Sequence, residues 1–422
     1  MTQPCSRRSV WNDCRCSNQG PSEMSLHIVD EGGIRDRLRE RIGAELADLE
    51  SRSQLRRLET PRGIDLSSND YLGLAADSRM KQAVLDAVGA GKRIASSGSR
   101  LLSGHDEAWT ALENNFARWV GTESALYFTS GYAANVGLLS AILRPEDIVF
   151  SDSANHASII DGIRFAKCQR VIFPHLDLGI LEEELRRRVS STGARVIVVE
   201  SIFSMDGDCS PLVDLAALAE RHGAELIVDE AHAIGVRGLA GSGLVAEAGL
   251  NTKVLATVHT CGKALAAAGA FVCGSAQLRS FLINRSRTFI FNTGLPPYFA
   301  AQVSAGMELA AQANEGRAHL ANLSGFLRAE LKKNGFDTAG SDSHIVPVIL
   351  GTNDAAVNFA AYLQDRGFGV RAIRPPTVPA GSARLRLSLT VKLSQEILAG
   401  LIAAMIQARN ANLSERSVST TR

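Results

Sequence analysis

The stretch that decides the fold is "ARVIVVESIFSMDGDCSPLVDLAALAERHGAELIVDEAH", residues 194–232. It contains two short apolar runs, at 196–199 and 226–228, which are rich in β-branched residues and end in polar residues. Between them, residues 212–223 carry apolar side chains at helical spacing. A strand, a helix and a second strand in this order predict two parallel strands joined by a crossover helix.

The same alternation continues on the N-terminal side of this stretch. "ALYFTSGYAANVGLLSAIL" (125–143) predicts a strand, a tight turn and a helix, and "DIVFSD" (147–152) and "QRVIFPH" (169–175) predict further strands. "ILEEELRRRVSS" (180–191) has the pattern of a helix. We therefore predict an α/β fold with a central, mostly parallel sheet that helices cover on both faces.

The rest of the chain divides into a few further parts. A long helical region at about 297–335 leads to "HIVPVIL" (344–350) and "ARLRLSLT" (383–390), which predict the strands of a small C-terminal α+β domain. The predicted parts are a disordered tail at 1–23, an N-terminal helical segment at 24–66, a large cofactor-binding domain at 67–300, the small domain with its linking helix at 301–410, and a second tail at 411–422.

Composition excludes several classes of protein. The 422 residues are 45% hydrophobic and 21% charged, with a formal net charge of +1, so neither nucleic acid nor an anionic membrane is an expected partner. We find no run of about 18 apolar residues and no secretory signal in the first 23 residues. The spacing of the seven cysteines matches neither a disulfide framework nor a zinc site. We expect a cytoplasmic protein with reduced thiols and no metal.

Polar side chains follow five strands of the predicted large sheet. In chain order they are Ser130 with Gly131, His156, Ser204, Asp229 with His232, and Thr260 with Lys263. Each has an ordinary alternative when taken alone: a structural turn, a surface histidine, a carboxylate that caps a turn, or a solvated lysine. The segment around Lys263 is not a phosphate-binding P-loop, because Thr257 and Ala264 stand where that motif needs Gly and Ser or Thr.

Taken together, these groups suit one cofactor. Parallel strands bring their carboxyl ends to one edge of the sheet, where ligands of open α/β sheets bind. A helix N-terminus holds a phosphate, a carboxylate keeps a ring nitrogen protonated, and a lysine amine forms a Schiff base with an aldehyde. Pyridoxal 5'-phosphate offers all three of these groups. We therefore expect a pyridoxal phosphate site at this edge.

Six segments resemble the α-oxoamine synthases, which are fold-type I pyridoxal phosphate enzymes. They are "SSNDYLGL" (67–74), "NHAS" (155–158), "SMDGD" (204–208), "VDEAH" (228–232), "TCGKAL" (260–265) and "IRPPTVPAGSARLRLSLT" (373–390). The resemblance covers about 34–410 and implies a large domain with a mostly parallel sheet, a small C-terminal domain, and a homodimer with a shared active site.

The resemblance also implies a role for each matching residue. Lys263 would be the Schiff-base lysine and the base that removes the α-proton, Asp229 would pair with the ring nitrogen, and His156 would stack on the ring. The other cofactor contacts would be His232 and Ser204 at the phenolic oxygen, Gly131, Tyr132 and Thr260 at the phosphate, and Thr293 at the phosphate across the dimer interface. The substrate contacts would be Arg374 at the amino acid's carboxylate, Asn69 and Thr377.

The reaction implied is the decarboxylative condensation of an amino acid with an acyl thioester. Residues 373–390 most resemble the branch of the family that serves biotin biosynthesis, which implies L-alanine and either pimeloyl-CoA or pimeloyl-acyl carrier protein. Two alternatives remain open: another member reaction, such as glycine C-acetyltransferase or serine C-acyltransferase, and a non-catalytic pyridoxal phosphate-binding protein. Three positions depart from the family pattern, namely Trp109, Asn155 and Cys261, and Trp109 could alter packing near the substrate.

Overall fold

The computed structural model describes residues 31–60, 62–188 and 192–411. The predicted tail at 1–23 and residues 412–422 of the second tail lie outside these ranges. By its internal contacts the chain divides into Met1–Leu55 and Arg56–Arg422. In the first unit, helix α1 spans Glu31–Ser51 and lies within the predicted N-terminal helical segment at 24–66, whose bounds stay a prediction. Everything below concerns the second unit.

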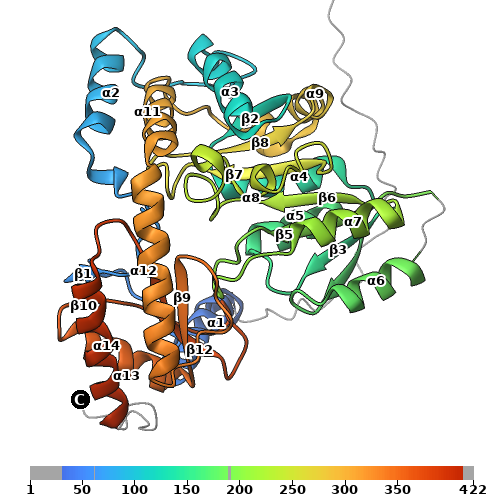
Figure 1. Ribbon diagram of the computed structural model, residues 1–422. Helices are drawn as coiled ribbons and strands as arrows, with labels where there is room; N and C mark the ends of the chain where they lie inside the picture. Colours follow the sequence, from blue (N-terminus) through green and yellow to red (C-terminus); the bar gives the residue numbers. More distant parts are fainter. Residues whose placement is uncertain (1–30, 61, 189–191, 412–422) are drawn as a thin grey trace, which may run out of the picture. The chain divides into compact units, whose positions relative to one another are not determined.

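The centre of this unit is a seven-stranded sheet (Figure 1). Its strands, in spatial order, are β2 (Ser124–Phe128), β8 (Ala270–Gly274), β7 (Ala256–Thr260), β6 (Glu225–Asp229), β5 (Arg195–Glu200), β3 (Ile148–Asp152) and β4 (Gln169–Phe173). β8 runs antiparallel to both of its neighbours, whereas the other pairs are parallel. The predicted α/β class with a mostly parallel sheet is confirmed.

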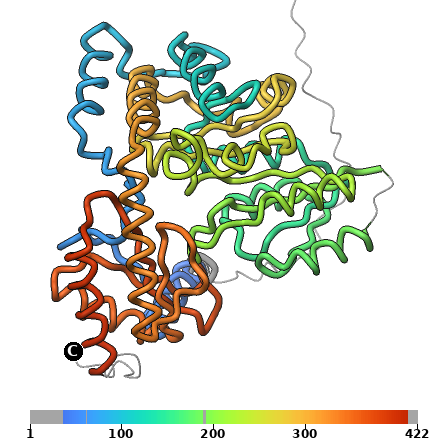
Figure 2. Tube along the Cα trace, in the orientation of Figure 1, coloured from blue at the N-terminus to red at the C-terminus, as the bar shows by residue number. Residues whose placement is uncertain are grey.

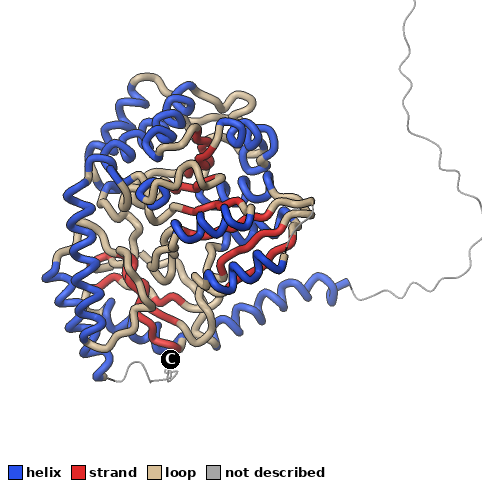
Figure 3. The backbone as a smooth tube through the Cα atoms, turned by 45° about the vertical axis from the view of Figure 1, so that its right-hand side comes forward, coloured by secondary structure: helices blue, strands red, loops and turns tan. Residues whose placement is uncertain are grey.

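Helices cover both faces of this sheet because its strands are apolar on both faces. In β5, Val196 and Val198 pack on one side while Ile197 and Val199 pack on the other, as a doubly covered parallel strand requires. On the first side lie α4 (Gly131–Ile142), α5 (Ala157–Ala166), α9 (Ala276–Arg285) and α10 (Arg287–Ile290). On the second lie α3 (Glu107–Val120), α6 (Leu178–Arg187), α7 (Leu212–His222) and α8 (Leu244–Glu247). Figure 3 shows the strands between these helices.

Two long helices lead from the large sheet to a small one. They are α11 (Tyr298–Gln312), which also packs against α2 (Ser78–Gly89), and α12 (Asn314–Lys333). Figure 2 follows the chain through both of them. The small antiparallel sheet has the order β11 (Ala372–Ile373), β12 (Ala383–Ser388), β9 (Ile345–Gly351). Beside it lie α13 (Asn353–Gln364), α14 (Gln395–Asn410) and the short parallel pair of β1 (Ile64–Asp65) and β10 (Phe368–Gly369).

One apolar cluster joins the two sheets. It runs from Trp109 and Phe271 beside the large sheet, through Val303 of α11, to Leu385 and Leu387 of the small sheet. Residues 56–422 therefore form one unit by their contacts, and the predicted domain boundary at residue 300 stays a prediction. Within the described ranges, none of the helices combines the length with the apolar composition that a membrane span requires.

Trp109, which departs from the family pattern, is a core residue. Its side chain is fully buried on α3 and stacks on Tyr127 with ring centroids 4.6 Å apart. The guanidinium carbon of Arg100 lies 5.8 Å from the Trp109 ring centroid. The indole therefore supports β2 from the side, and it does not line the pocket described next.

Candidate active site

A pocket of about 170 Å³ opens at the carboxyl ends of β5, β6 and β7. Its lining residues come from these strand ends and from the first turns of α4 and α5. They are Gly131, Tyr132, Asn135, His156, Ser158, Glu200, Asp229, Ala231, His232, Val258, Thr260 and Lys263. Of the residues predicted from the sequence, the pocket brings together Gly131, Tyr132, His156, Asp229, His232, Thr260 and Lys263.

Lys263 lies at one end of a chain of hydrogen bonds. Its Nζ is 2.7 Å from Nε2 of His232, and Nδ1 of His232 is 2.6 Å from the hydroxyl of Tyr71. The Tyr71 hydroxyl donates to Oδ1 of Asn69 at 2.9 Å. This chain is satisfied when neutral His232 carries its proton on Nδ1 and its Nε2 accepts from the lysine. Asn69 therefore acts at a distance from Lys263, through Tyr71 and His232.

The electrostatics of this chain favour a neutral amine at Lys263. Burial lowers the pKa of Lys263 to about 8, although the carboxylates of Asp229 and Glu200 oppose the shift. Burial and the positive charge of Lys263 hold the pKa of His232 well below its usual value. Burial also raises the pKa of Tyr71 to about 12, so its hydroxyl keeps its proton. Near pH 7 to 8 a sizeable fraction of Lys263 is therefore an uncharged nucleophile and base.

Asp229 ends β6 and is buried, and neutral groups hold its carboxylate. Oδ2 accepts from Nδ2 of Asn135 at 2.7 Å, and Oδ1 accepts from the backbone N–H of Ala231 at 2.8 Å. The Asn135 amide also donates to the Ser158 hydroxyl at 3.0 Å. A buried carboxylate held by neutral donors keeps its negative charge available for a cationic partner in the pocket.

His156 is the N-cap residue of α5 and is exposed where it lines the pocket. Its Nδ1 accepts from the backbone N–H of Ser158 at 3.2 Å and lies 2.8 Å from the Ser158 hydroxyl. Burial lowers the pKa of His156, and Asp229 and Lys263 act on it in opposite directions. A neutral imidazole fixed through one nitrogen suits a stacking role.

The N-terminus of α4 lies beside Thr260. Ser130 caps the helix by accepting from the backbone N–H of Ala133 at 3.1 Å. A Cβ added to Gly131 would stand 3.4 Å from Oγ1 of Thr260, which is an ordinary van der Waals distance, so the first turn of α4 lies directly beside the end of β7. Free N–H groups of a first turn beside a threonine hydroxyl form a natural anion site. Tyr132 is exposed, and its hydroxyl donates to Asp161.

Five of the predicted residues lie outside the lining of this pocket, namely Asn69, which is described above, and four others. Ser204 is buried in the loop after β5, where its backbone N–H donates to Oε2 of Glu200 at 3.2 Å. Thr293 is exposed and pairs with Ser99 in an isolated β-bridge. Thr377 is exposed after β11, and its hydroxyl accepts from Arg56 at 3.2 Å. The fourth, Arg374, is part-buried on the same loop and accepts through its carbonyl from Thr377.

Two charged residues that the sequence reasoning missed are buried at the site. Arg386 of β12 donates from both terminal nitrogens to Oδ1 of Asn69 at 3.2 Å, and from Nε to the carbonyl of Ser204. Glu200 ends β5 as the register partner of Asp229. Burial and then the neighbouring Asp229 raise the pKa of Glu200 to about 8. In the sequence, the signal for both Arg386 and Glu200 is a charged residue in an otherwise apolar strand. Such a charge needs a polar or charged partner when the strand is buried.

The donor set fits pyridoxal phosphate. A lysine with a lowered pKa, a buried carboxylate held by neutral donors, an exposed imidazole and a helix N-terminus all open into one pocket. These groups match the cofactor's aldehyde, ring nitrogen, ring face and phosphate, respectively. Ser204 and Thr293 are the two predicted cofactor contacts that the pocket does not include.

The chain belongs to the aminotransferase class I and II family, whose sequence profile matches residues 61–404. It is 44% identical to 8-amino-7-oxononanoate synthase from Anaeromyxobacter dehalogenans, over 86% of this chain and 94% of that protein. The structure of 8-amino-7-oxononanoate synthase from Francisella tularensis superposes with a TM-score of 0.73 at 26% identity, covering 83% of this chain and 98% of that one.

A second kind of relative shares the fold. A lysine-to-alanine variant of serine palmitoyltransferase from S. paucimobilis, solved with a bound PLP–myriocin aldimine, superposes with a TM-score of 0.82 at 29% identity, covering 89% of this chain and 99% of that one. The prediction of a fold-type I enzyme that resembles the α-oxoamine synthases is confirmed by these likenesses.

Proposed function

We propose that the chain is a pyridoxal phosphate-dependent C-acyltransferase. It condenses L-alanine with a pimeloyl thioester and gives 8-amino-7-oxononanoate, CO2 and the free thiol, a step of biotin biosynthesis. The observation that carries this proposal is that the Lys263 amine, whose pKa is lowered, and the buried Asp229 carboxylate line the same pocket. The 44% identity to a relative named for this reaction selects the substrates.

Each group of the pocket has one task towards the cofactor. Lys263 would hold the aldehyde carbon, Asp229 the ring nitrogen and His156 the ring face. The first turn of α4 and Thr260 would hold the phosphate. When bound, pyridoxal phosphate supplies an electron sink that acidifies the α-carbon of the amino acid. His232 faces Lys263 Nζ and fixes where that amine points.

Once the amino group of L-alanine has taken the place of Lys263 at the aldehyde carbon, the freed lysine amine would accept the proton of the α-carbon. With a pKa of about 8, the Lys263 amine is a base well matched to neutral pH. Neutral His232 accepts a hydrogen bond from this amine, and Tyr71 holds the other ring nitrogen of His232. The same amine would return a proton to the product carbon after CO2 has left, because Lys263 lines the pocket in which the substrate would lie.

Arg386 is the group that we propose for the substrate carboxylate, in place of Arg374. Arg386 is buried, and its charge acts on the pKa values of both Lys263 and His232. Neither arginine is among the residues that line the pocket, but Arg386 contacts Asn69, which Tyr71 links to His232, whereas Arg374 lies on a part-exposed loop. We expect Arg386→Lys to raise the KM for L-alanine by about tenfold or more, because a lysine loses the bidentate geometry. Arg374→Lys should stay within about threefold of the wild type.

We also propose a homodimer whose interface includes Thr293. Thr293 is joined to Ser99 by a β-bridge, and Leu102 and Phe291 near them are 84% and 72% exposed. Exposed apolar side chains that cluster beside a predicted shared contact favour a second copy as the partner. We expect Leu102→Glu to lower the dimer fraction in sedimentation, whereas Leu239→Glu, a change at another exposed leucine, should not.

A substrate panel tests the reaction. Purified protein with pyridoxal phosphate is given L-alanine with pimeloyl-CoA, L-alanine with pimeloyl-acyl carrier protein, glycine with acetyl-CoA, and L-serine with palmitoyl-CoA. We expect the highest kcat/KM for a pimeloyl pair, and comparison of the two pimeloyl thioesters identifies the carrier. The likeness to serine palmitoyltransferase makes the serine pair the second candidate. A higher kcat/KM for the glycine or serine pair would overturn the choice of substrate.

We also propose a cytoplasmic location, which suits the free thiols of the described cysteines.

A further inference from the structure

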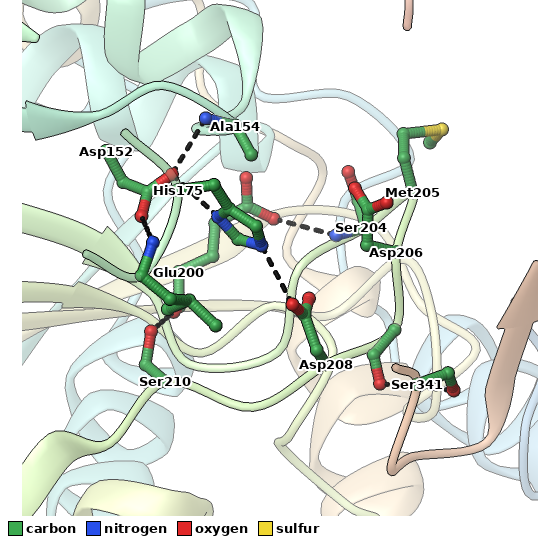
Figure 4. A network of polar contacts seen from close by, with 12 residues as sticks. Asp152, Ala154, His175, Glu200, Ser204, Met205, Asp206, Asp208, Ser210 and Ser341 are labelled. Atoms are coloured by element: carbon green, nitrogen blue, oxygen red, sulfur yellow. Dashed lines mark hydrogen bonds and ion pairs between the residues drawn. The ribbon is translucent and has the colours of Figure 1, made fainter. Parts of the chain in front are cut away.

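A histidine outside the pocket joins two segments that border it. His175 follows β4, and its Nδ1 lies 2.9 Å from Oδ1 of Asp152, the last residue of β3. Its Nε2 lies 2.8 Å from Oδ2 of Asp208, in the loop after β5. Phe203 of the same loop packs edge-on against the imidazole, with ring centroids 4.4 Å apart. Figure 4 shows His175 between the two carboxylates.

This arrangement requires a charged imidazole. Both ring nitrogens face carboxylate oxygens, which only accept hydrogen bonds, so both nitrogens donate and His175 is an imidazolium. Burial alone would lower the pKa of His175, but its hydrogen bonds to Asp152 and Asp208 and their charges together raise it to about 10. His175 therefore links the two segments through two charge-assisted hydrogen bonds at any ordinary pH.

The two carboxylates depend on His175 to different degrees. Asp152 also accepts from the backbone N–H groups of Ala154 at 2.8 Å and Leu176 at 2.9 Å, and its side chain is fully buried. For Asp208, Oδ2 contacts His175, while Oδ1 is buried and has no hydrogen-bond partner among the described residues. Loss of the imidazolium would leave Asp152 held and Asp208 unpaired. An unpaired carboxylate that is largely buried is costly, so the loop would shift towards water.

The loop at 203–208 is closed on itself and contacts the small sheet through Ser204 and Asp206. The backbone N–H of Phe203 donates to the carbonyl of Asp208 at 3.0 Å, and that of Gly207 donates to the carbonyl of Phe203 at 2.9 Å. The carbonyl of Ser204 accepts from Arg386, and Asp206 pairs with Arg384 on the same strand. Displacing this loop would therefore move the arginine that contacts Asn69.

We propose that His175 is a positioning residue for the amino-acid substrate. Its imidazolium fixes the 203–208 loop through Asp208, and the loop holds Arg384 and Arg386, so that the Arg386 guanidinium keeps its contact with Asn69. The residues that would bind the cofactor stay in place without His175, because Asp152 keeps its hydrogen bonds to backbone N–H groups. This inference rests on the proposed function, since it assigns the amino acid's carboxylate to Arg386.

The test compares His175→Asn with a matched control, His222→Asn. His222 ends α7, and its Nε2 lies 3.2 Å from Oε1 of Glu182, away from the 203–208 loop. For His175→Asn we expect the KM for L-alanine to rise about tenfold or more, with kcat and the Kd for pyridoxal phosphate within about threefold of the wild type. The control should match the wild type in all three constants.

Two further measurements keep the inference testable if His175→Asn folds poorly. Asp208→Asn keeps an acceptor for the imidazolium and should raise the KM for L-alanine in the same direction but less. Hydrogen exchange of the Phe203 and Gly207 amides, measured on protein without cofactor, should be faster in both variants than in the wild type and the His222 control. A His175→Asn protein with unchanged KM and unchanged exchange would refute the positioning role.

A further comparison separates a specific role from a general loss of folding. If the variants lose active protein in proportion, kcat per total protein falls while the KM for L-alanine stays the same, and His175 is then merely structural. If the two changes act through the same loop, the double variant should have the KM of His175→Asn rather than the product of the two effects. Wild-type protein that does not turn over L-alanine would refute the proposed function, whereas wild-type turnover beside variants of normal KM would refute only the positioning role.

Discussion

Replacing Glu200 by Gln should stabilise the protein while removing an acid from the pocket. Glu200 is 3% exposed, its Oε2 accepts from the backbone N–H of Ser204, and its Oε1 has no hydrogen-bond partner among the described residues. A glutamine fits this environment, because its oxygen can keep the bond to Ser204 and its amide nitrogen replaces the unpaired oxygen. The substitution therefore changes the charge with little change in shape.

The magnitude follows from the pKa of Glu200. Burial raises it from 4.5 to about 8, so between these values the unfolded chain is ionised while the folded chain keeps the proton. The stability that comes from the raised pKa is complete below pH 4.5 and is lost as the pH rises through 8. At about 1.4 kcal/mol for each pH unit, ionisation of Glu200 stabilises the unfolded state by about 3 kcal/mol at pH 7. Glutamine does not ionise, so the variant does not lose this free energy of unfolding. For a chain of this size that is roughly 4 °C in the melting midpoint.

Thermal melts of cofactor-free protein at a series of pH values from 5 to 9 measure this effect. The advantage of Glu200→Gln should be under about 1 kcal/mol at pH 5, grow with pH and level off above pH 8. Glu220→Gln is the control, because Glu220 is exposed and pairs with Lys253 on the surface, so its effect should stay within about 0.5 kcal/mol. A variant advantage that is the same at pH 5 and pH 8, or a less stable variant at pH 8, would refute the assignment of a raised pKa to Glu200.

Three further predictions concern the loop, the lysine and the carboxylate. Gly207→Ala should lower the free energy of unfolding in urea by at least about 2 kcal/mol, because φ is +70° and the added Cβ would lie 1.9 Å from the Ile345 carbonyl oxygen; a loss under about 0.5 kcal/mol would contradict this close approach. Cofactor-free protein should take up pyridoxal phosphate covalently at a rate that rises with pH around a midpoint near 8, the lowered pKa of Lys263, and a midpoint near 10.5 would show an ordinary lysine. Asp229→Asn should lower kcat/KM by about a hundredfold or more, since a neutral amide does not keep the ring nitrogen protonated, and a loss within threefold would show that the carboxylate has another role.

The sequence was sufficient to predict the fold class and the edge of the sheet where the site lies. Apolar runs such as 196–199 and 226–228 end in polar residues, and parallel strands bring those ends together. Asp229 and Lys263 could therefore be assigned to one pocket although 34 residues separate them in sequence. That inference needs only strand order and direction, which local patterns supply.

Contacts that depend on how the two sheets dock could not be predicted in this way. Arg386 lies within a strand of the small sheet, and its partners Asn69 and Ser204 are 317 and 182 residues away in sequence. Its role as a partner of Asn69 depends on the placement of the 203–208 loop, which no local pattern encodes. Arg374 drew attention instead because it lies in the recognisable "IRPPT" segment, yet the structure places that segment on a part-exposed loop.

His175 shows the same limitation in another form. In the sequence it is only the last residue of "QRVIFPH", a strand followed by a proline turn. Its two partners come from other strand connections, 23 and 33 residues away, so the bridge exists only once the sheet has formed. Buried polar groups of this kind are recognised by their hydrogen-bond partners rather than by their spacing.

The most direct measurement follows the carboxyl carbon of the amino acid. L-Alanine labelled at C1 is mixed with protein, pyridoxal phosphate and a pimeloyl thioester, and labelled CO2, free thiol and 8-amino-7-oxononanoate are quantified together. We expect the three to appear in equal amounts with wild-type protein, and none of them above background with Lys263→Ala. Thiol released without labelled CO2, or equal yields from Lys263→Ala, would contradict decarboxylative condensation by the Lys263 amine.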